Sequence, residues 1–149
     1  RSDLGIIVQG GITNVLMRGL SRLDVDGQIP ALVLNVTHPL VPDQIADFCK
    51  GKRAVLVVEE GQPDFIEQAI NAILRRAGVD TKVVGKGLLP MAGEYTGGVV
   101  REGIRKFIEK TRPDLLPSSG AAADTAPLNK PAFKPLNWPR EKLRQLLRR

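Results

Sequence analysis

Short apolar runs alternate with helix-like segments along residues 4–110, and this alternation limits the fold more than any other feature of the sequence. Four runs have the length and composition of buried strands; they cover residues 4–9, 31–36, 54–59 and 81–84. Strands separated by helices are joined by right-handed crossovers, which place a parallel sheet between two layers of helices. We therefore predict an α/β fold, a three-layer α/β/α sandwich with a mostly parallel sheet of about 4–5 strands.

The segments between these runs carry apolar residues three or four positions apart, the spacing of one face of an α-helix. They predict helices over residues 12–23, 43–48, 63–77 and 96–110. Gly78 directly follows the third segment, at a position where glycine commonly ends a helix. Residues 88–91 form either a further edge strand or a loop.

The amino-acid composition of the sequence changes after residue 110. Six of the 11 prolines fall between residues 113 and 139, with a serine- and alanine-rich stretch among them. We predict an α/β domain over residues 1–110, a Pro/Ala/Ser-rich linker over residues 111–137 and a short basic amphipathic helix over residues 138–149. The chain opens on Arg1 without an initiator methionine or a signal-peptide pattern, so we expect a fragment of a longer chain, with the terminal helix leading to a further domain.

The net charge of the α/β domain argues against nucleic acid as a partner, and the length of its apolar runs argues against a membrane. The formal net charge is +6, and residues 111–149 hold +5 of it, with eight Lys or Arg and three Asp or Glu. A nearly neutral domain argues against a nucleic-acid-binding surface, which needs cations clustered on one face. The longest uninterrupted apolar run, residues 54–58, is far too short for a bilayer span. We expect neither nucleic acid nor membrane as a partner.

One cysteine, Cys49, is present. It excludes an internal disulfide and any zinc or iron–sulfur site ligated by several cysteines of this chain. We expect a cytoplasmic protein, in which Cys49 is a small buried apolar residue and not a reactive thiol.

Ligands of parallel sheets bind at the carboxyl ends of the strands. The loops expected there include residues 9–11, 37–39, 59–61 and 85–87. Gly10 and Gly11 lack both the dinucleotide fingerprint and the P-loop pattern, which favours a tight turn over a phosphate site. His38, next to Thr37, is the single histidine; no nucleophile stands at a recognisable spacing from it, which favours a packed or interface role over acid–base catalysis.

Carboxylates offer two further candidates. Glu59 and Glu60 precede Gly61 at the end of the most apolar strand, where paired carboxylates could share a proton. Adjacent strand residues point to opposite faces, so we expect the two not to act as a pair. Glu94 precedes the last helix and is expected to complement the positive end of that helix.

Four sequence strings carry a family resemblance when they are taken together and in order. They are Leu4-Gly5-Ile6-Ile7-Val8-Gln9-Gly10-Gly11, Leu34-Asn35-Val36-Thr37-His38-Pro39-Leu40-Val41-Pro42, Val57-Val58-Glu59-Glu60-Gly61 and Leu89-Pro90-Met91-Ala92-Gly93-Glu94. Over roughly residues 4–110 the chain resembles the transketolase-C-terminal-like middle domain of the indolepyruvate ferredoxin oxidoreductases, which are thiamine diphosphate-dependent 2-oxoacid:ferredoxin oxidoreductases.

The resemblance implies an enzyme that oxidatively decarboxylates arylpyruvates with coenzyme A and reduces ferredoxin, using thiamine diphosphate, Mg²⁺ and iron–sulfur clusters. The relatives bind the thiamine cofactor between a pyrimidine-binding and a diphosphate-binding domain, and this segment matches neither. The resemblance therefore implies no catalytic, cofactor-binding or metal-binding residue in this segment, and we do not expect the segment to be active alone. The implied role is accessory: loops 37–42 and 59–61 and the terminal helix would face those flanking domains and a second subunit.

The residues leave other interpretations open. A stand-alone nucleotide- or flavin-binding module could use the strand-end loops, and an adaptor could bind RNA or a membrane through residues 138–149. Within the family, a pyruvate or 2-oxoglutarate enzyme is possible. An α/β domain taken from its neighbours exposes an apolar patch, so we also expect a homo-oligomer with a contact near residues 37–62.

Overall fold

The computed structural model describes residues 2–61 and 63–117. Its elements follow one another as β1 (Leu4–Gln9), a 3₁₀ turn (Gly10–Ile12), α1 (Thr13–Arg22), β2 (Ala31–Leu34), α2 (Pro42–Cys49), β3 (Ala54–Val58), α3 (Phe65–Ala77), β4 (Lys82–Val84), α4 (Gly97–Thr111) and a second 3₁₀ turn (Pro113–Leu115). The predicted terminal helix and most of the predicted linker lie outside the described residues.

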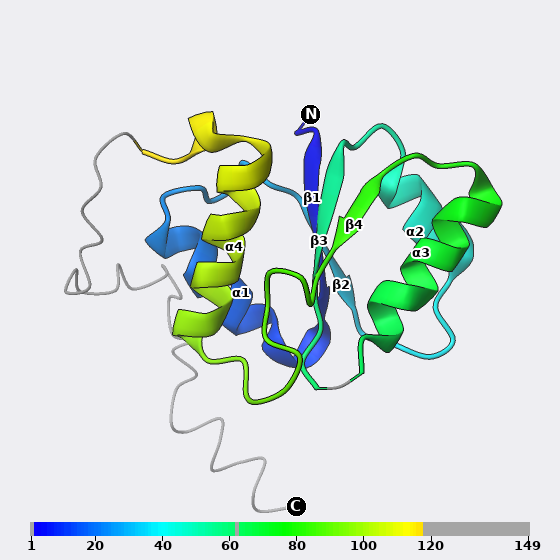
Figure 1. The fold of residues 1–149 in the computed structure, drawn as a ribbon, viewed down its shortest axis with the longest axis horizontal. Helices are drawn as coiled ribbons and strands as arrows, with labels where there is room; N and C mark the ends of the chain where they lie inside the picture. The colour runs from blue at the N-terminus through cyan, green and yellow to red at the C-terminus, as the bar shows by residue number, and fades with distance from the viewer. Residues whose placement is uncertain (1, 62, 118–149) are drawn as a thin grey trace, which may run out of the picture. The chain divides into compact units, whose positions relative to one another are not determined.

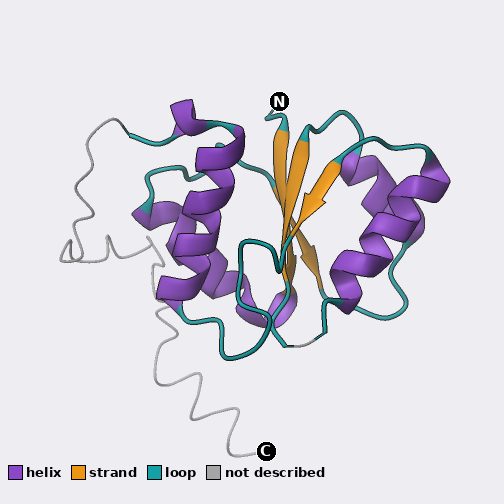
Figure 2. Cartoon of the chain, viewed as in Figure 1, coloured by secondary structure: helices purple, strands orange, loops and turns teal. Residues whose placement is uncertain are grey.

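The four strands form one parallel sheet in the order β2-β1-β3-β4. Helices α1 and α4 cover one face and α2 and α3 cover the other, as Figures 1 and 2 show. The structure confirms the predicted three-layer α/β/α sandwich. Residues 88–91 contain no strand and belong to the loop between β4 and α4.

Two hydrophobic cores lie on the two faces of the sheet, because successive strand residues point to opposite sides. Leu4, Ile6 and Val8 of β1 pack against the α1 and α4 layer, whereas Ile7 packs in the α2 and α3 layer. All five residues of β3 are buried, which explains why this run is apolar throughout.

Helix ends follow the local sequence with one exception. Gly78 ends α3 with a left-handed φ of 64°, and the hydroxyl of Thr96 accepts a hydrogen bond from Val99 N–H at the start of α4. The predicted third helix starts two residues late, at Phe65. The reason is tertiary, because its first N–H groups are bound by a carboxylate from the sheet.

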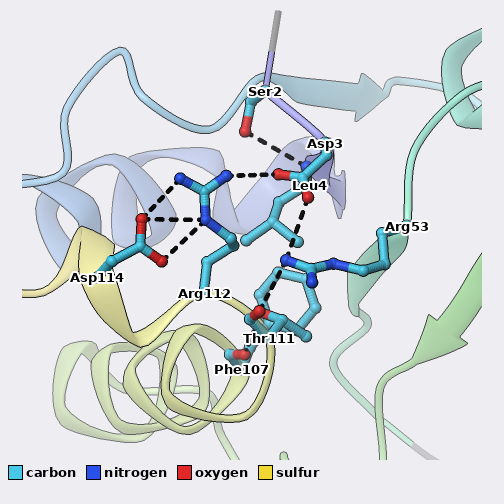
Figure 3. Close-up of polar contacts among 8 residues, drawn as sticks. All are labelled: Ser2, Asp3, Leu4, Arg53, Phe107, Thr111, Arg112 and Asp114. Carbon is cyan, nitrogen blue, oxygen red and sulfur yellow. Dashed lines mark hydrogen bonds and ion pairs between the residues drawn. The ribbon is translucent and has the colours of Figure 1, made fainter.

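The domain continues past the end of α4. Leu115 and Leu116 pack against the core on the α4 side. Figure 3 shows the polar contacts that hold this end: Arg112 and Arg53 both pair with the carboxylate of Asp3, at 2.8 and 3.1 Å, and Arg53 also donates to the carbonyl of Thr111. The last turn of α4 is thereby tied to the starts of β1 and β3.

No helix among the described residues is long and apolar enough to cross a membrane.

Candidate functional site

All four strands end at the same edge of the sheet, here called the carboxyl edge, and the candidate residues lie in its loops (lower side of Figure 1). Thr37 and His38 belong to the loop between β2 and α2 and are both exposed. A histidine packed inside this domain, one of the two roles predicted for His38, is therefore wrong. The interface role stays a prediction.

Glu59 follows β3 directly, and its buried carboxylate, 6% exposed, serves the backbone of α3. Its two oxygens accept hydrogen bonds from Ile66 N–H at 3.0 and 3.1 Å, and one accepts from Glu67 N–H at 3.2 Å. A carboxylate at a helix N-terminus satisfies donors that have no partner within the helix and complements its positive end. Glu59 is thus a cap supplied from the sheet.

Glu60 points elsewhere, so the prediction that the two glutamates do not act as a pair is confirmed, although both lie beyond the end of β3 and strand alternation is not the cause. Its N–H donates to the side-chain oxygen of Gln9 at 2.7 Å, and its carboxylate accepts from Tyr95 N–H at 2.6 Å. The two neighbouring glutamates therefore bind different elements and do not act as a pair. Glu94 is exposed, and the cap at the start of α4 is the hydroxyl of Thr96.

The centre of the carboxyl edge is Lys86, which the sequence analysis did not single out. Its ammonium donates to the carbonyls of Gly61 and Glu59 at 2.6 and 2.7 Å and to the hydroxyl of Tyr95 at 2.8 Å. Two longer contacts reach the carbonyls of Pro90 and Met91 at 3.4 and 3.3 Å. One ammonium thus joins the loop after β3 to the loop after β4.

The backbone around Lys86 needs a glycine on its N-terminal side. The N–H of Lys86 donates to the carboxylate of Glu67 at 2.9 Å. A β-carbon on Gly85 would lie 3.1 Å from the carbonyl oxygen of Val57 and 3.0 Å from the carboxylate carbon of Glu67. The Gly-Lys-Gly string of this loop was the available sequence signal, although spacing alone does not indicate its partners.

Burial dominates the electrostatics of this cluster. Desolvation lowers the pKa of Lys86 below its ordinary value, and the carboxylates of Glu59, Asp64, Glu67 and Glu60 oppose this shift. Burial raises the pKa of Tyr95 to about 12, and the nearby glutamates add to the effect. The phenol therefore stays neutral at ordinary pH, accepting from Lys86 and donating to the carbonyl of Pro90 at 2.7 Å.

The arrangement is suited to holding loops, since the polar groups of Glu59, Glu60, Lys86 and Tyr95 are bound to one another or to backbone. In the described part of the chain no group of three or more His, Cys, Asp or Glu residues could hold a metal ion. A surface depression of about 530 Å³ lies between the C-terminal ends of α2 and α3, at the opposite edge from these loops.

Cys49 is fully buried at the end of α2. Burial raises the pKa of its thiol to about 11, and Lys52 opposes the shift. Both observations agree with the predicted buried, unreactive residue.

No family model matches the chain. The curated proteins that are similar to it include three described as indolepyruvate oxidoreductase subunit IorA. The protein from Methanothermobacter marburgensis is 39% identical over 105 residues, 69% of this chain and 16% of that protein. The protein from Methanothermobacter thermautotrophicus is 34% identical over 105 residues, again 69% of this chain and 16% of that protein. The protein from Archaeoglobus fulgidus is 35% identical over 108 residues, 71% of this chain and 16% of that protein.

The chain therefore spans about a sixth of the length of the curated relatives that it matches. Over most of its own length, this chain is a relative of one segment of the indolepyruvate oxidoreductase subunit IorA, which confirms the resemblance drawn from its sequence strings.

Proposed function

We propose that this chain is an accessory domain of an indolepyruvate ferredoxin oxidoreductase. The parent enzyme oxidatively decarboxylates arylpyruvates to aryl-acetyl-CoA and reduces ferredoxin, in the cytoplasm. The observation that carries the proposal is the similarity, up to 39% identity, to proteins named for indolepyruvate oxidation. The domain itself contributes structure, and catalysis belongs to other parts of the parent.

The chemistry of the carboxyl edge supports the accessory role. Thiamine diphosphate with Mg²⁺ needs cations or backbone N–H groups for its phosphates and oxygen ligands for its metal. Here the ammonium of Lys86 is surrounded by oxygen acceptors, and the carboxylates of Glu59 and Glu60 accept from backbone N–H groups. These residues do not fit the cofactor, so we assign its binding to the flanking pyrimidine- and diphosphate-binding domains.

Thermal unfolding of the 149-residue chain tests the proposal against a ligand-binding alternative. The panel is thiamine diphosphate with Mg²⁺, NAD, FMN, ATP and coenzyme A. A ligand at 100 times its dissociation constant would stabilise the fold by about 2.7 kcal/mol, a shift of several degrees in Tm. We expect no shift with any of them. A clear shift with a nucleotide or FMN would favour a stand-alone binding module.

A chimera tests the family role directly. This chain would replace the matched segment of the Methanothermobacter marburgensis subunit, and indolepyruvate-dependent reduction of ferredoxin would be assayed. We expect activity to be retained, with substrate preference unchanged because the substrate site lies elsewhere in the subunit. Altered substrate preference would contradict the accessory role.

A further inference from the structure

Large apolar side chains are exposed mainly at the carboxyl edge. Among the described residues five large hydrophobic side chains are exposed, and four of them lie in the loops or first helical turns at this edge: Val36, Val41, Phe65 and Met91. Phe65 is 67% exposed and Val36 63%. The fifth, Met17, lies on α1. Apolar side chains gathered in this way indicate a surface that another polypeptide covers.

The same edge is acidic. Its described loops and first helical turns carry six carboxylates: Asp43, Glu59, Glu60, Asp64, Glu67 and Glu94. One ammonium, that of Lys86, opposes them there, and it is already held by internal oxygen acceptors. Asp43 and Glu94 are exposed, so their charge faces any partner directly.

Charge selects between the possible occupants of this surface. A second copy docking through the same edge would bring six further carboxylates against these, and like charges facing each other oppose association. A partner with lysine or arginine side chains around an apolar centre would complement both properties. The relatives are about six times longer than the matched segment, so most of their length is available to supply such a partner.

We infer that the carboxyl-edge surface, formed by residues 35–41, 61, 63–65 and 90–95, is a docking site for a basic polypeptide surface with an apolar centre. The inference deepens the proposed function and rests on it, because it gives the chemistry of the neighbour against which the accessory domain packs.

The internal network prepares this surface for docking. Lys86 joins the loops after β3 and β4, and Glu60 links the first of these to Tyr95. Loops fixed before contact lose less conformational entropy when a partner binds. The polar groups at the centre are therefore occupied internally, and the exposed apolar and acidic side chains are left to make the contact.

Amide chemical shifts of the isotope-labelled 149-residue chain test the inference at low ionic strength. The probes are a synthetic amphipathic peptide of leucine, lysine and arginine, and its counterpart with glutamate at every basic position. We expect the basic peptide to shift the backbone amides of the non-proline residues among 35–41, 61, 63–65 and 90–95, and the acidic peptide to have no effect. Equal binding of both peptides, no binding of either, or shifts confined to other residues would overturn the inference.

Matched variants distinguish the effect of charge at this surface from nonspecific electrostatic binding to the chain. The triple variant Asp43→Asn, Asp64→Asn, Glu94→Gln should weaken binding of the basic peptide about tenfold, as expected for losing the exposed charges of Asp43 and Glu94 and the half-buried charge of Asp64. The control triple variant Asp24→Asn, Asp26→Asn, Asp80→Asn makes the same change in net charge at the opposite edge and should leave binding unchanged. Equal weakening in both variants would overturn the inference.

A second pair of variants tests the apolar part of the surface. Phe65→Ser should weaken peptide binding, whereas Met17→Ser on α1 should not; the reverse result would contradict the assignment. Sedimentation of the unmodified chain tests whether a second copy occupies this surface. Self-association that Phe65→Ser abolishes would show that the partner is a second copy of the chain and not a basic polypeptide. A higher Tm with FMN or a nucleotide would contradict the proposed accessory function itself, independently of the peptide results.

Discussion

The ammonium of Lys86 lies 2.8 Å from the hydroxyl oxygen of Tyr95 and 4.8 Å from the centre of its ring. One lysine therefore holds both the polar and the aromatic part of a single side chain. The hydroxyl in turn donates to the carbonyl of Pro90, so the contact fixes the loop between β4 and α4 at both of its ends. The stability of this loop should depend on the pair more than on any other contact at the carboxyl edge.

Replacement of Lys86 by methionine should destabilise the fold. The substitution keeps the length of the side chain but removes the donor for the carbonyls of Glu59 and Gly61 and for Tyr95. We expect a loss of about 2 kcal/mol in the free energy of unfolding, the usual cost of leaving partly buried acceptors without a charged donor. Urea unfolding measures it as a lower midpoint at constant slope.

Lys106→Met is the matched control, because Lys106 is exposed and its one ion pair with another described residue is with Glu102, at 3.6 Å. Its loss should be below about 0.5 kcal/mol. Equal losses in the two variants would show that the Lys86 contacts do not hold the edge together.

Tyr95 makes stability fall at alkaline pH. Its pKa is raised from 10.0 to about 12 in the folded chain, so the folded state keeps its proton where the unfolded state has lost it. The stabilisation is complete below pH 10 and is lost as pH rises towards 12, by up to about 3 kcal/mol. The sequence contains one tyrosine, so tyrosinate absorbance reports this group alone.

We expect the absorbance midpoint to lie near pH 12 in the folded chain and near pH 10 in concentrated urea. Tyr95→Phe should remove the corresponding decline in the free energy of unfolding. Lys86 titrates in both proteins, and its lowered pKa acts in the opposite direction, so the difference between the two pH profiles isolates the phenol. A single midpoint near pH 10 under both conditions would contradict the buried phenol.

The sheet and its helices were predictable because their signals are local. The apolar run of β3 and the helical spacing that ends at Gly78 need no knowledge of distant residues. Strand ends were less predictable: the run 31–36 gives a strand only to Leu34, and Val36 is exposed in the following loop.

The centre of the carboxyl edge could not be predicted in the same way. Lys86 binds the carbonyl of Glu59, 27 residues away, and Glu60 binds the N–H of Tyr95, 35 residues away. Only the folded sheet brings these loops together, and a lysine in a glycine-bordered loop looks like any exposed lysine. The start of α3 was misplaced for the same reason, since its cap comes from Glu59 and not from a neighbour in the sequence.

Cys49 should be unreactive while the domain is folded. Its side chain is fully buried, and the pKa of its thiol is raised from 9.0 to about 11, so at pH 8 the reactive thiolate is about 100-fold rarer than in an exposed cysteine. A disulfide reagent such as Ellman's reagent should react slowly with the native chain and fully in urea, with one thiol per chain. Native reaction at the rate of the unfolded chain would contradict this burial.

Two glycines of α4 should respond to alanine in opposite directions. A β-carbon on Gly103 would lie 2.9 Å from the side-chain γ-carbon of buried Leu89, so Gly103→Ala forces the helix and the loop after β4 apart. We expect a loss of about 1–3 kcal/mol, as for other overpacked cores. Among the described residues, a β-carbon on Gly98 meets only the hydroxyl of Thr96, at 3.9 Å, so Gly98→Ala should add about 0.5–1 kcal/mol through the higher helix propensity of alanine. Thermal and urea unfolding of both variants would measure the pair, and a stabilised Gly103→Ala variant would show that Leu89 does not pack against α4 at this position.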